Sequence, residues 1–207
     1  MISDDQIISI YEKIKNSRFS LFTNENKNIL PKKSGIYGIF LNDGIKFSKD
    51  FKFEDFEYRS DGLIYIGISE NLSKREVKQH FISNNSSNST VRRSIGSIEK
   101  ENLNLIAIPR GNGDCNHYRF ADKKRIGEKK LTDWMCNNLK LGYYEYSENR
   151  GLNKFEMKIL VQKLKEIEKK MIIMFDPPLN IIFRDLKKVE KLKKLREICK
   201  KQAYKNK

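Results

Sequence analysis

The chain has 207 residues, of which 38% are hydrophobic, and a formal net charge of +15, which predicts one domain, or one domain with large insertions, and an anionic partner. No apolar run approaches the ~18 residues of a membrane-spanning helix, and the acidic first residues hold no apolar secretory segment, so neither a membrane protein nor a secreted one is expected. The three cysteines have no CxxC spacing, which argues against a disulfide framework or a structural zinc site and favours a reducing cytoplasm.

Hydrophobic periodicity and turn residues divide the first half of the chain into a helix, two strands and a short helix. These elements are expected over residues 1–18, 34–42, 63–68 and 71–82. Ser3 or Asp4 is a suitable N-cap for the first helix, and Asn42-Asp43-Gly44 ends the first strand in a turn. A loop rich in Ser and Asn follows the short helix over residues 83–90.

The second half of the chain alternates helices with short strands. Its elements are expected over residues 91–103, 105–109, 131–139, 143–146, 152–175 and 184–207. Pro177 and Pro178 end the long helix. The expected organisation is an N-terminal helix and connector at 1–33, a core at 34–182 with insertions at about 43–62 and 83–150, and a basic C-terminal helix at 183–207.

The long helix predicted over 152–175 has a carboxylate within its apolar stripe. At ~100° per residue, Glu168 lies at the centre of an arc of apolar side chains, which are Met157, Val161, Leu164, Met171, Ile172 and Phe175. A buried carboxylate without a partner is very costly. Glu168 is therefore expected either to meet solvent or a basic residue, or to be presented into a site as a metal ligand or an acid–base group.

Positive charge is concentrated in the C-terminal helix, where residues 184–207 hold 11 basic and 3 acidic residues. Lysine supplies 31 of the 42 basic residues in the chain, a bias that AT-rich codon usage also produces, so total charge alone indicates nucleic-acid binding only weakly. The helix is either a solvated terminus or an arm that follows phosphates. An apolar stripe would let it dock on the core, through Leu186, Val189, Leu192, Leu195 and Ile198.

Two groups of basic side chains are candidates for contact with nucleic-acid phosphates. On the C-terminal helix they are Lys187, Lys188, Lys191 and Lys194. Arg92 and Arg93, next to the Ser/Asn loop, either contact backbone phosphates or are simply solvated.

Four motifs resemble, in their order along the chain, the signature of the GIY-YIG nuclease family. Gly35-Ile36-Tyr37 lies on the first predicted strand and Tyr65-Ile66-Gly67 on the second. Arg75 comes ten residues after Tyr65, at the offset at which the family carries its arginine. His80 follows on the same short helix.

The closing motif of the family has a counterpart at the end of the long helix. Glu168 precedes Asn180 by twelve residues, in a segment that ends Pro-Pro-Leu-Asn. The glutamate singled out by helix geometry is thus the one that the family uses to bind metal. Two segments, 89–94 and 131–135, are also similar to those of a stand-alone bacterial branch with an enlarged middle region.

The resemblance covers roughly residues 34–182 and implies an α/β (α+β) fold, with a small, mostly antiparallel central sheet flanked by helices and interrupted by insertions. It also implies one Mg²⁺ (or Mn²⁺) ion per active site, with Glu168 as the metal ligand. A single carboxylate with several waters is ordinary magnesium coordination, and a two-metal site is not expected.

The same resemblance implies a role for each remaining catalytic candidate. Tyr37 is the candidate general base or proton relay, Tyr65 would orient the water or the phosphate, and His80 would accept or relay a proton. Arg75 offers a bidentate cation for a phosphate. Asn180 would fix the geometry next to the metal.

Two spacings depart from the pattern of the family. Tyr37 and Tyr65 are 28 residues apart, where many members have a short hairpin, although the restriction-endonuclease branch tolerates a comparable excursion. Arg75 and His80 are five residues apart where the family usually has four, and on a regular helix five residues turn ~140°. Either the helix begins after Arg75, or it carries a bulge, or one of the two residues is displaced.

The function expected from these observations is that of a metal-dependent DNA endonuclease of restriction or defence type. The alternatives are a structure-specific repair or recombination nuclease, and a non-catalytic basic DNA-binding protein on a nuclease scaffold. Cleavage of both strands by one active site per chain would favour a homodimer.

Overall fold

The computed structural model describes residues 2–20, 30–47, 59–73, 80–81, 85–111, 113–121, 126–147 and 152–207. These residues form an α+β fold in which a four-stranded antiparallel sheet and a second, two-stranded sheet are accompanied by five α-helices. The fold class expected from the sequence is therefore confirmed. Arg75 and most of the insertion expected at 43–62 lie outside the described residues.

The central sheet has the strand order β1-β6-β2-β3. The strands are β1 (Phe19–Ser20), β2 (Ser34–Leu41), β3 (Leu63–Ser69) and β6 (Leu139–Ser147). In the pairing of β2 with β3, Tyr37 lies opposite Gly67 and Ile39 opposite Tyr65, after which the register shifts so that Phe40 lies opposite Leu63. This bulge leaves Ile64 as an extra residue in β3 and turns it toward the same face as Tyr65.

Both faces of the central sheet are covered by other parts of the protein. The evidence is β2, a central strand in which every residue is buried. Tyr37, Ile39 and Leu41 belong to one apolar cluster, whereas Ile36 and Phe40 belong to the other. This alternation follows from the two-residue period of a strand. The second cluster includes apolar side chains of α1 (Asp4–Asn16) and α4 (Lys154–Phe175), so these two helices cover the face opposite to Tyr37.

The two helices on that face are tied together at one end of the sheet. Tyr11 of α1 stacks on Phe175 at the end of α4, with the ring centroids 4.0 Å apart, and its hydroxyl donates to Asp61 just before β3. Asp61 also accepts from Arg59 at 2.8 Å. Ser3 caps α1 in a capping box with Gln6, as one of the two N-caps expected from the sequence.

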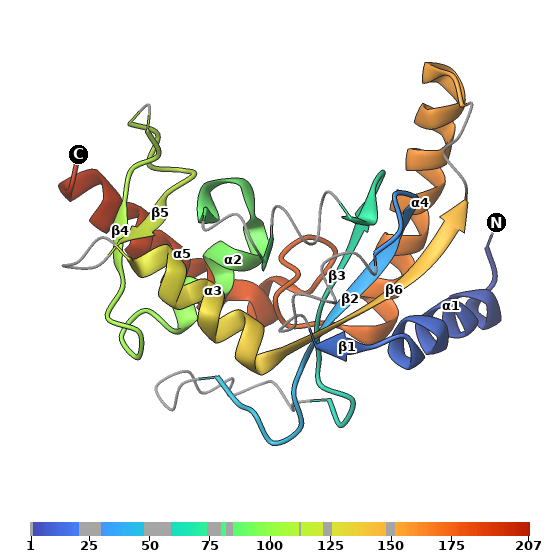
Figure 1. Ribbon diagram of the computed structural model, residues 1–207, viewed down its shortest axis with the longest axis horizontal. Coiled ribbons are helices and arrows are strands. Elements are labelled where there is room, and N and C mark those ends of the chain that lie inside the picture. Colours follow the sequence, from blue (N-terminus) through green and yellow to red (C-terminus); the bar gives the residue numbers. More distant parts are fainter. Residues whose placement is uncertain are drawn as a thin grey trace.

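The segment between β3 and β6 and the C-terminal helix form the other end of the molecule (Figure 1). Its elements are the 3₁₀ turn η3 (Ser86–Asn88), α2 (Thr90–Ile98), β4 (Ile106–Ile108), β5 (Arg119–Ala121), α3 (Gly127–Asn138) and α5 (Leu186–Lys205). α5 packs against β4 and α2, and the backbone N–H of Ala107 in β4 donates to Gln202 in α5 at 2.9 Å.

Three expectations differ from the observed elements. β5 falls in a stretch expected to be irregular, and β6 is a nine-residue central strand, not a short one at 143–146. The buried stripe of α5 differs from the one expected from the sequence. Its buried residues are Val189, Leu192, Cys199 and Ala203. Leu186 and Ile198, expected on that stripe, are 73% and 56% exposed, and the small residues Cys199 and Ala203 allow the close approach to β4 and α2.

Candidate active site

The two tyrosines of the predicted motifs lie on one face of the β2–β3 pair. Their ring centroids are 6.1 Å apart, because Tyr37 lies opposite Gly67 and Tyr65 lies two positions away on the same strand. The Tyr37 ring crosses directly over Gly67, where a Cβ atom would come within 2.5 Å of Tyr37 Cζ. Gly67 of the Tyr65-Ile66-Gly67 motif is therefore needed for the position of the Tyr37 ring.

His80 completes a cluster with these tyrosines. Its Nε2 lies 3.0 Å from the Tyr37 hydroxyl, and the side chain is 1% exposed. Ser73, His80 and Phe81 have π-helical hydrogen bonding, in which the repeat is i to i+5. Arg75 lies outside the described residues, so the explanations of its five-residue spacing from His80 stay predictions.

Asn180 is fixed to the strand that carries Tyr65. Its side-chain amide donates to the carbonyl of Ile66 at 2.8 Å and accepts from the N–H of the same residue at 2.9 Å. The N–H of Leu179 donates to the carbonyl of Ile64 at 2.9 Å. The Pro-Pro-Leu-Asn segment thus occupies the outer edge of β3, and Asn180 replaces the hydrogen bonds of a missing neighbouring strand.

Glu168 lies at the margin of the buried stripe of α4 and not at its centre. The buried residues of this helix are Leu160, Leu164, Ile167, Met171 and Ile172, and at ~100° per residue their mean direction is about 50° to one side of Glu168. The glutamate is accordingly half-buried. α4 packs against β3 and β2 from the face opposite to Tyr37, so Glu168 is presented from the helix behind the sheet.

A family model for the GIY-YIG catalytic domain matches residues 35–201. The chain belongs to the GIY-YIG nuclease family. Comparison with curated proteins and with solved structures gave no significant match. None of the helices in the described part of the chain has a stretch long and apolar enough to cross a membrane.

The GIY-YIG domain brings some of the expected site residues together and leaves others apart. Tyr37, Tyr65 and His80 form one cluster, and Asn180 is bonded to the residue after Tyr65. Glu168 is on the helix behind this sheet. Arg75 lies outside the described residues.

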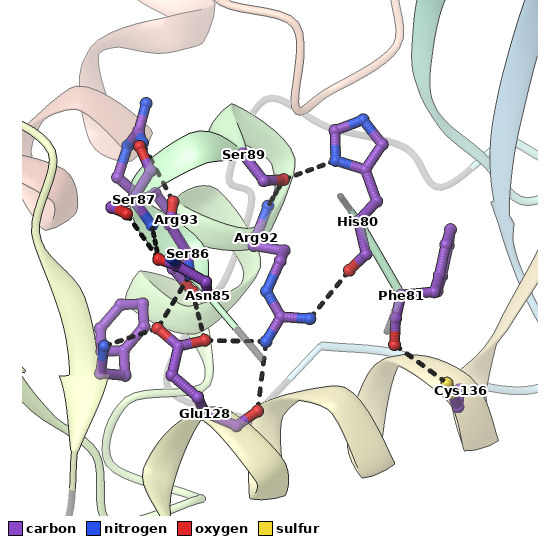
Figure 2. Close-up of polar contacts among 11 residues, drawn as sticks. His80, Phe81, Asn85, Ser86, Ser87, Ser89, Arg92, Arg93, Glu128 and Cys136 are labelled. Carbon is purple, nitrogen blue, oxygen red and sulfur yellow. Dashed lines mark hydrogen bonds and ion pairs between the residues drawn. The ribbon is translucent and has the colours of Figure 1, made fainter. Parts of the chain in front are cut away.

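Arg92 and Arg93 do not lie on the surface, contrary to the interpretation of both as phosphate contacts or solvated charges. Arg92 is 0% exposed and forms a 2.8 Å ion pair with Glu128. Arg93 is 6% exposed and donates to the carbonyls of Ser86 and Ser87 at 3.0 and 2.6 Å. Burial, together with the nearby charge of Arg196, lowers the pKa of Arg93 to about 10. Both guanidiniums are engaged within the fold (Figure 2).

Of the lysines expected to bind phosphate, those at 187, 188 and 194 are exposed on α5 and Lys191 is half-buried. Lys188 also pairs with Asp176 at 2.7 Å, and Lys194 with Glu190 at 2.7 Å. A cleft of about 530 Å³ runs along this helix, lined by four of its basic side chains and by Asn116, Tyr118, Ile181, Glu190 and Glu197. The basic side chains are Lys193, Lys194, Arg196 and Lys200. Ile181 follows Asn180 directly, so the cleft includes the residue next in the chain to a member of the candidate site.

Two residues close to the site were not singled out from the sequence. Ser89 lies 2.6 Å from His80 Nδ1, and Glu128 holds Arg92, which in turn donates to the His80 carbonyl at 2.8 Å. The N-cap position of Ser89, before a helix that starts Thr-Val-Arg-Arg, is a signal that could be found. Glu128 has no such signal, because its partner is 36 residues away.

We expect the Gly67→Ala variant to lose cleavage activity in the GIY-YIG site without unfolding. The added Cβ would overlap the buried Tyr37 ring, and forcing the ring away breaks its hydrogen bond to His80. Overpacking of this kind costs about 1–3 kcal/mol, and loss of an aligned proton-transfer group costs about 10²–10⁴-fold in rate. Thermal denaturation and DNA cleavage are the measurements. Gly111→Ala is the control, since its Cβ would meet open space; equal cleavage by the two variants would show that the position of Tyr37 does not matter.

Proposed function

We propose that this protein is a DNA endonuclease that hydrolyses phosphodiester bonds with the help of Mg²⁺ (or Mn²⁺), and that it acts in restriction or defence. The observation that carries the proposal is the contact between Tyr37 and His80, with a 3.0 Å separation between Oη and Nε2 and with Tyr65 on the same face. A phenol against an imidazole, next to a second phenol, is an arrangement suited to removing a proton from an attacking water.

The remaining groups supply the other needs of phosphodiester hydrolysis. Tyr65, which is half-buried, orients the water or the phosphate at the mouth of the cluster. Arg75 is assigned to the phosphate by its place in the family motif, and its guanidinium would stabilise charge on the phosphoryl oxygens. Asn180, in the segment that follows α4, is hydrogen-bonded to β3. It thereby fixes the position of α4, which carries Glu168, relative to the strand that carries Tyr65.

The donor set of the site fits a magnesium ion. Glu168 is a half-buried carboxylate at the margin of α4, and no cluster of three metal-ligating side chains occurs among the residues that the structure describes. Mg²⁺ commonly binds through one or two carboxylates, with waters and substrate phosphates as the other ligands. When bound by Glu168, such an ion would supply charge stabilisation for the phosphate and the leaving oxygen.

The position of the positive charge supports DNA as the substrate. The exposed lysines of α5 and the cleft lined by four of its basic side chains offer a cationic surface, and contacts of lysine with phosphates give affinity without sequence information. The part of the chain between β3 and β6, at the same end of the molecule (Figure 1), is the place for elements that read the DNA.

The test is cleavage of supercoiled plasmid and of a random-sequence duplex library. We expect cutting with Mg²⁺ or Mn²⁺, none with EDTA, and product ends that share one sequence. Ends without a shared sequence, together with faster cutting of branched DNA, would favour a repair or recombination nuclease. Binding without cutting under any metal condition would identify a DNA-binding protein on a nuclease scaffold. Linear products at the first turnover, and a mass in solution of twice 24.5 kDa, are expected of a homodimer that cuts both strands.

A further inference from the structure

Ser89 connects the candidate site to the start of α2. Its side chain is 0% exposed and lies between two partners (Figure 2). On one side the hydroxyl oxygen accepts the backbone N–H of Arg92 at 3.1 Å, which makes Ser89 the N-cap of α2. On the other side it lies 2.6 Å from His80 Nδ1.

Counting donors and acceptors decides the direction of the second hydrogen bond. A serine hydroxyl has one proton and two lone pairs, and the N–H of Arg92 occupies one of the lone pairs. Of the two contacts of the Ser89 hydroxyl within the residues that the structure describes, the one with His80 Nδ1 is the one in which the hydroxyl proton can be donated. A protonated Nδ1 would donate to the serine instead and would leave a buried hydroxyl proton without an acceptor, which folded proteins avoid.

We propose that Ser89 is a positioning residue that fixes His80 as the tautomer with its proton on Nε2, so that His80 donates a hydrogen bond to the oxygen of Tyr37. The catalytic meaning of this assignment rests on the proposed nuclease function. A hydrogen bond donated to a phenol oxygen favours its charged form. Neutral His80 therefore assists Tyr37 as a donor, whereas the acceptor role that the family resemblance suggested for His80 would need the opposite tautomer.

The backbone of His80 is fixed as well as its ring. Arg92 donates to the His80 carbonyl at 2.8 Å, and the carboxylate of Glu128 holds the same guanidinium at 2.8 Å. Glu128 in turn accepts from Ser86 and Phe120. The His80 carbonyl is thus held by Arg92 and its Nδ1 by Ser89 (Figure 2), and these two contacts orient the Nε2 that faces Tyr37.

Nitrogen-15 NMR of the histidine side chains tests the assignment directly. The chain has only two histidines, and His117 is a half-exposed residue paired with Asp114. In a protein that carries His117→Gln, the only histidine signals are therefore those of His80. We expect Nε2 to be protonated and Nδ1 to be unprotonated near neutral pH. In Ser89→Asp the carboxylate still caps α2 but has no proton to donate, so Nδ1 should become protonated. Cleavage should then fall by about 10²-fold, the contribution of one aligned acid–base group.

Ser89→Thr is the matched variant, because it keeps both the cap and the hydroxyl proton, and it should retain the tautomer and most of the activity. A proton on Nδ1 in the protein that retains Ser89 would overturn the proposal, and this readout needs no substitution within the buried network. Retention of full cleavage by a folded Ser89→Asp variant would overturn it too. If the Ser89 protein shows the expected tautomer but cuts no DNA, the proposed function fails while the tautomer assignment stands, so the two failures are distinguishable.

Discussion

Glu168→Gln should abolish DNA cleavage and leave DNA binding intact. The amide has nearly the shape of the carboxylate, so α4 should pack as before, but it lacks the charge that would hold a divalent ion. Charge stabilisation by a metal is worth several kcal/mol in the transition state, which corresponds to a loss of about 10³-fold in rate. Single-turnover cleavage and fluorescence anisotropy with labelled duplex measure the two effects separately.

Glu166→Gln is the matched control for this experiment. Glu166 is exposed on the same helix two residues earlier, and the substitution makes the same change in net charge. It should cut like the unaltered protein. Electron paramagnetic resonance of Mn²⁺ adds a readout that does not depend on activity, with weaker binding expected only for the substitution at 168. Comparable cleavage by the two variants would remove Glu168 from the site.

Glu128→Ala should destabilise the protein more than any other single substitution in the buried network. The carboxylate accepts from Arg92, from Ser86 and from the backbone of Phe120, and Arg92 is 0% exposed. Removing one partner of a buried ion pair leaves the other charge uncompensated and costs about 3–5 kcal/mol. The free energy of unfolding in urea measures the loss.

Two companion variants separate the ion pair from ordinary packing. The double variant Arg92→Met with Glu128→Leu removes both charges and should be less destabilised than the sum of the single changes, because the buried charges disappear together. Lys129→Ala removes an exposed ion pair with Asp133 on the same helix, and its effect should be small. Additive losses in the double variant would mean that Arg92 and Glu128 act independently.

Local patterns in the sequence were enough to predict most elements of the fold. The α1 helix, the strands β2 and β3 and the helix α4 all follow from apolar periodicity and from caps within a few residues. The tyrosines of β2 and β3 are brought to one face by strand alternation together with the register that places Tyr37 opposite Gly67. β5 (Arg119–Ala121) could not be found because it lies in a polar, glycine-containing stretch, whereas β4, of the same length, lies in the apolar run at residues 105–108.

Long-range partners account for the features of the site that sequence reasoning missed. Arg92 and Arg93 carry the residue type of a phosphate contact, and only tertiary structure reveals that Glu128 and the carbonyls of η3 hold them in the interior. The displacement of Glu168 from the centre of its stripe has a similar cause. Ile167, which the predicted apolar arc left out, is 2% exposed, and its burial helps to move the centre of the buried stripe away from Glu168.

The proposed hydrolysis depends on the pairing of Tyr37 with His80, and single-turnover cleavage by Tyr37→Phe tests this pairing most directly. Phenylalanine keeps the ring that packs over Gly67 and removes only the hydroxyl that lies 3.0 Å from His80. We expect unchanged DNA binding and a rate lower by at least about 10²-fold at saturating Mg²⁺. A Tyr37→Phe protein that cuts DNA as fast as the unaltered chain would contradict it.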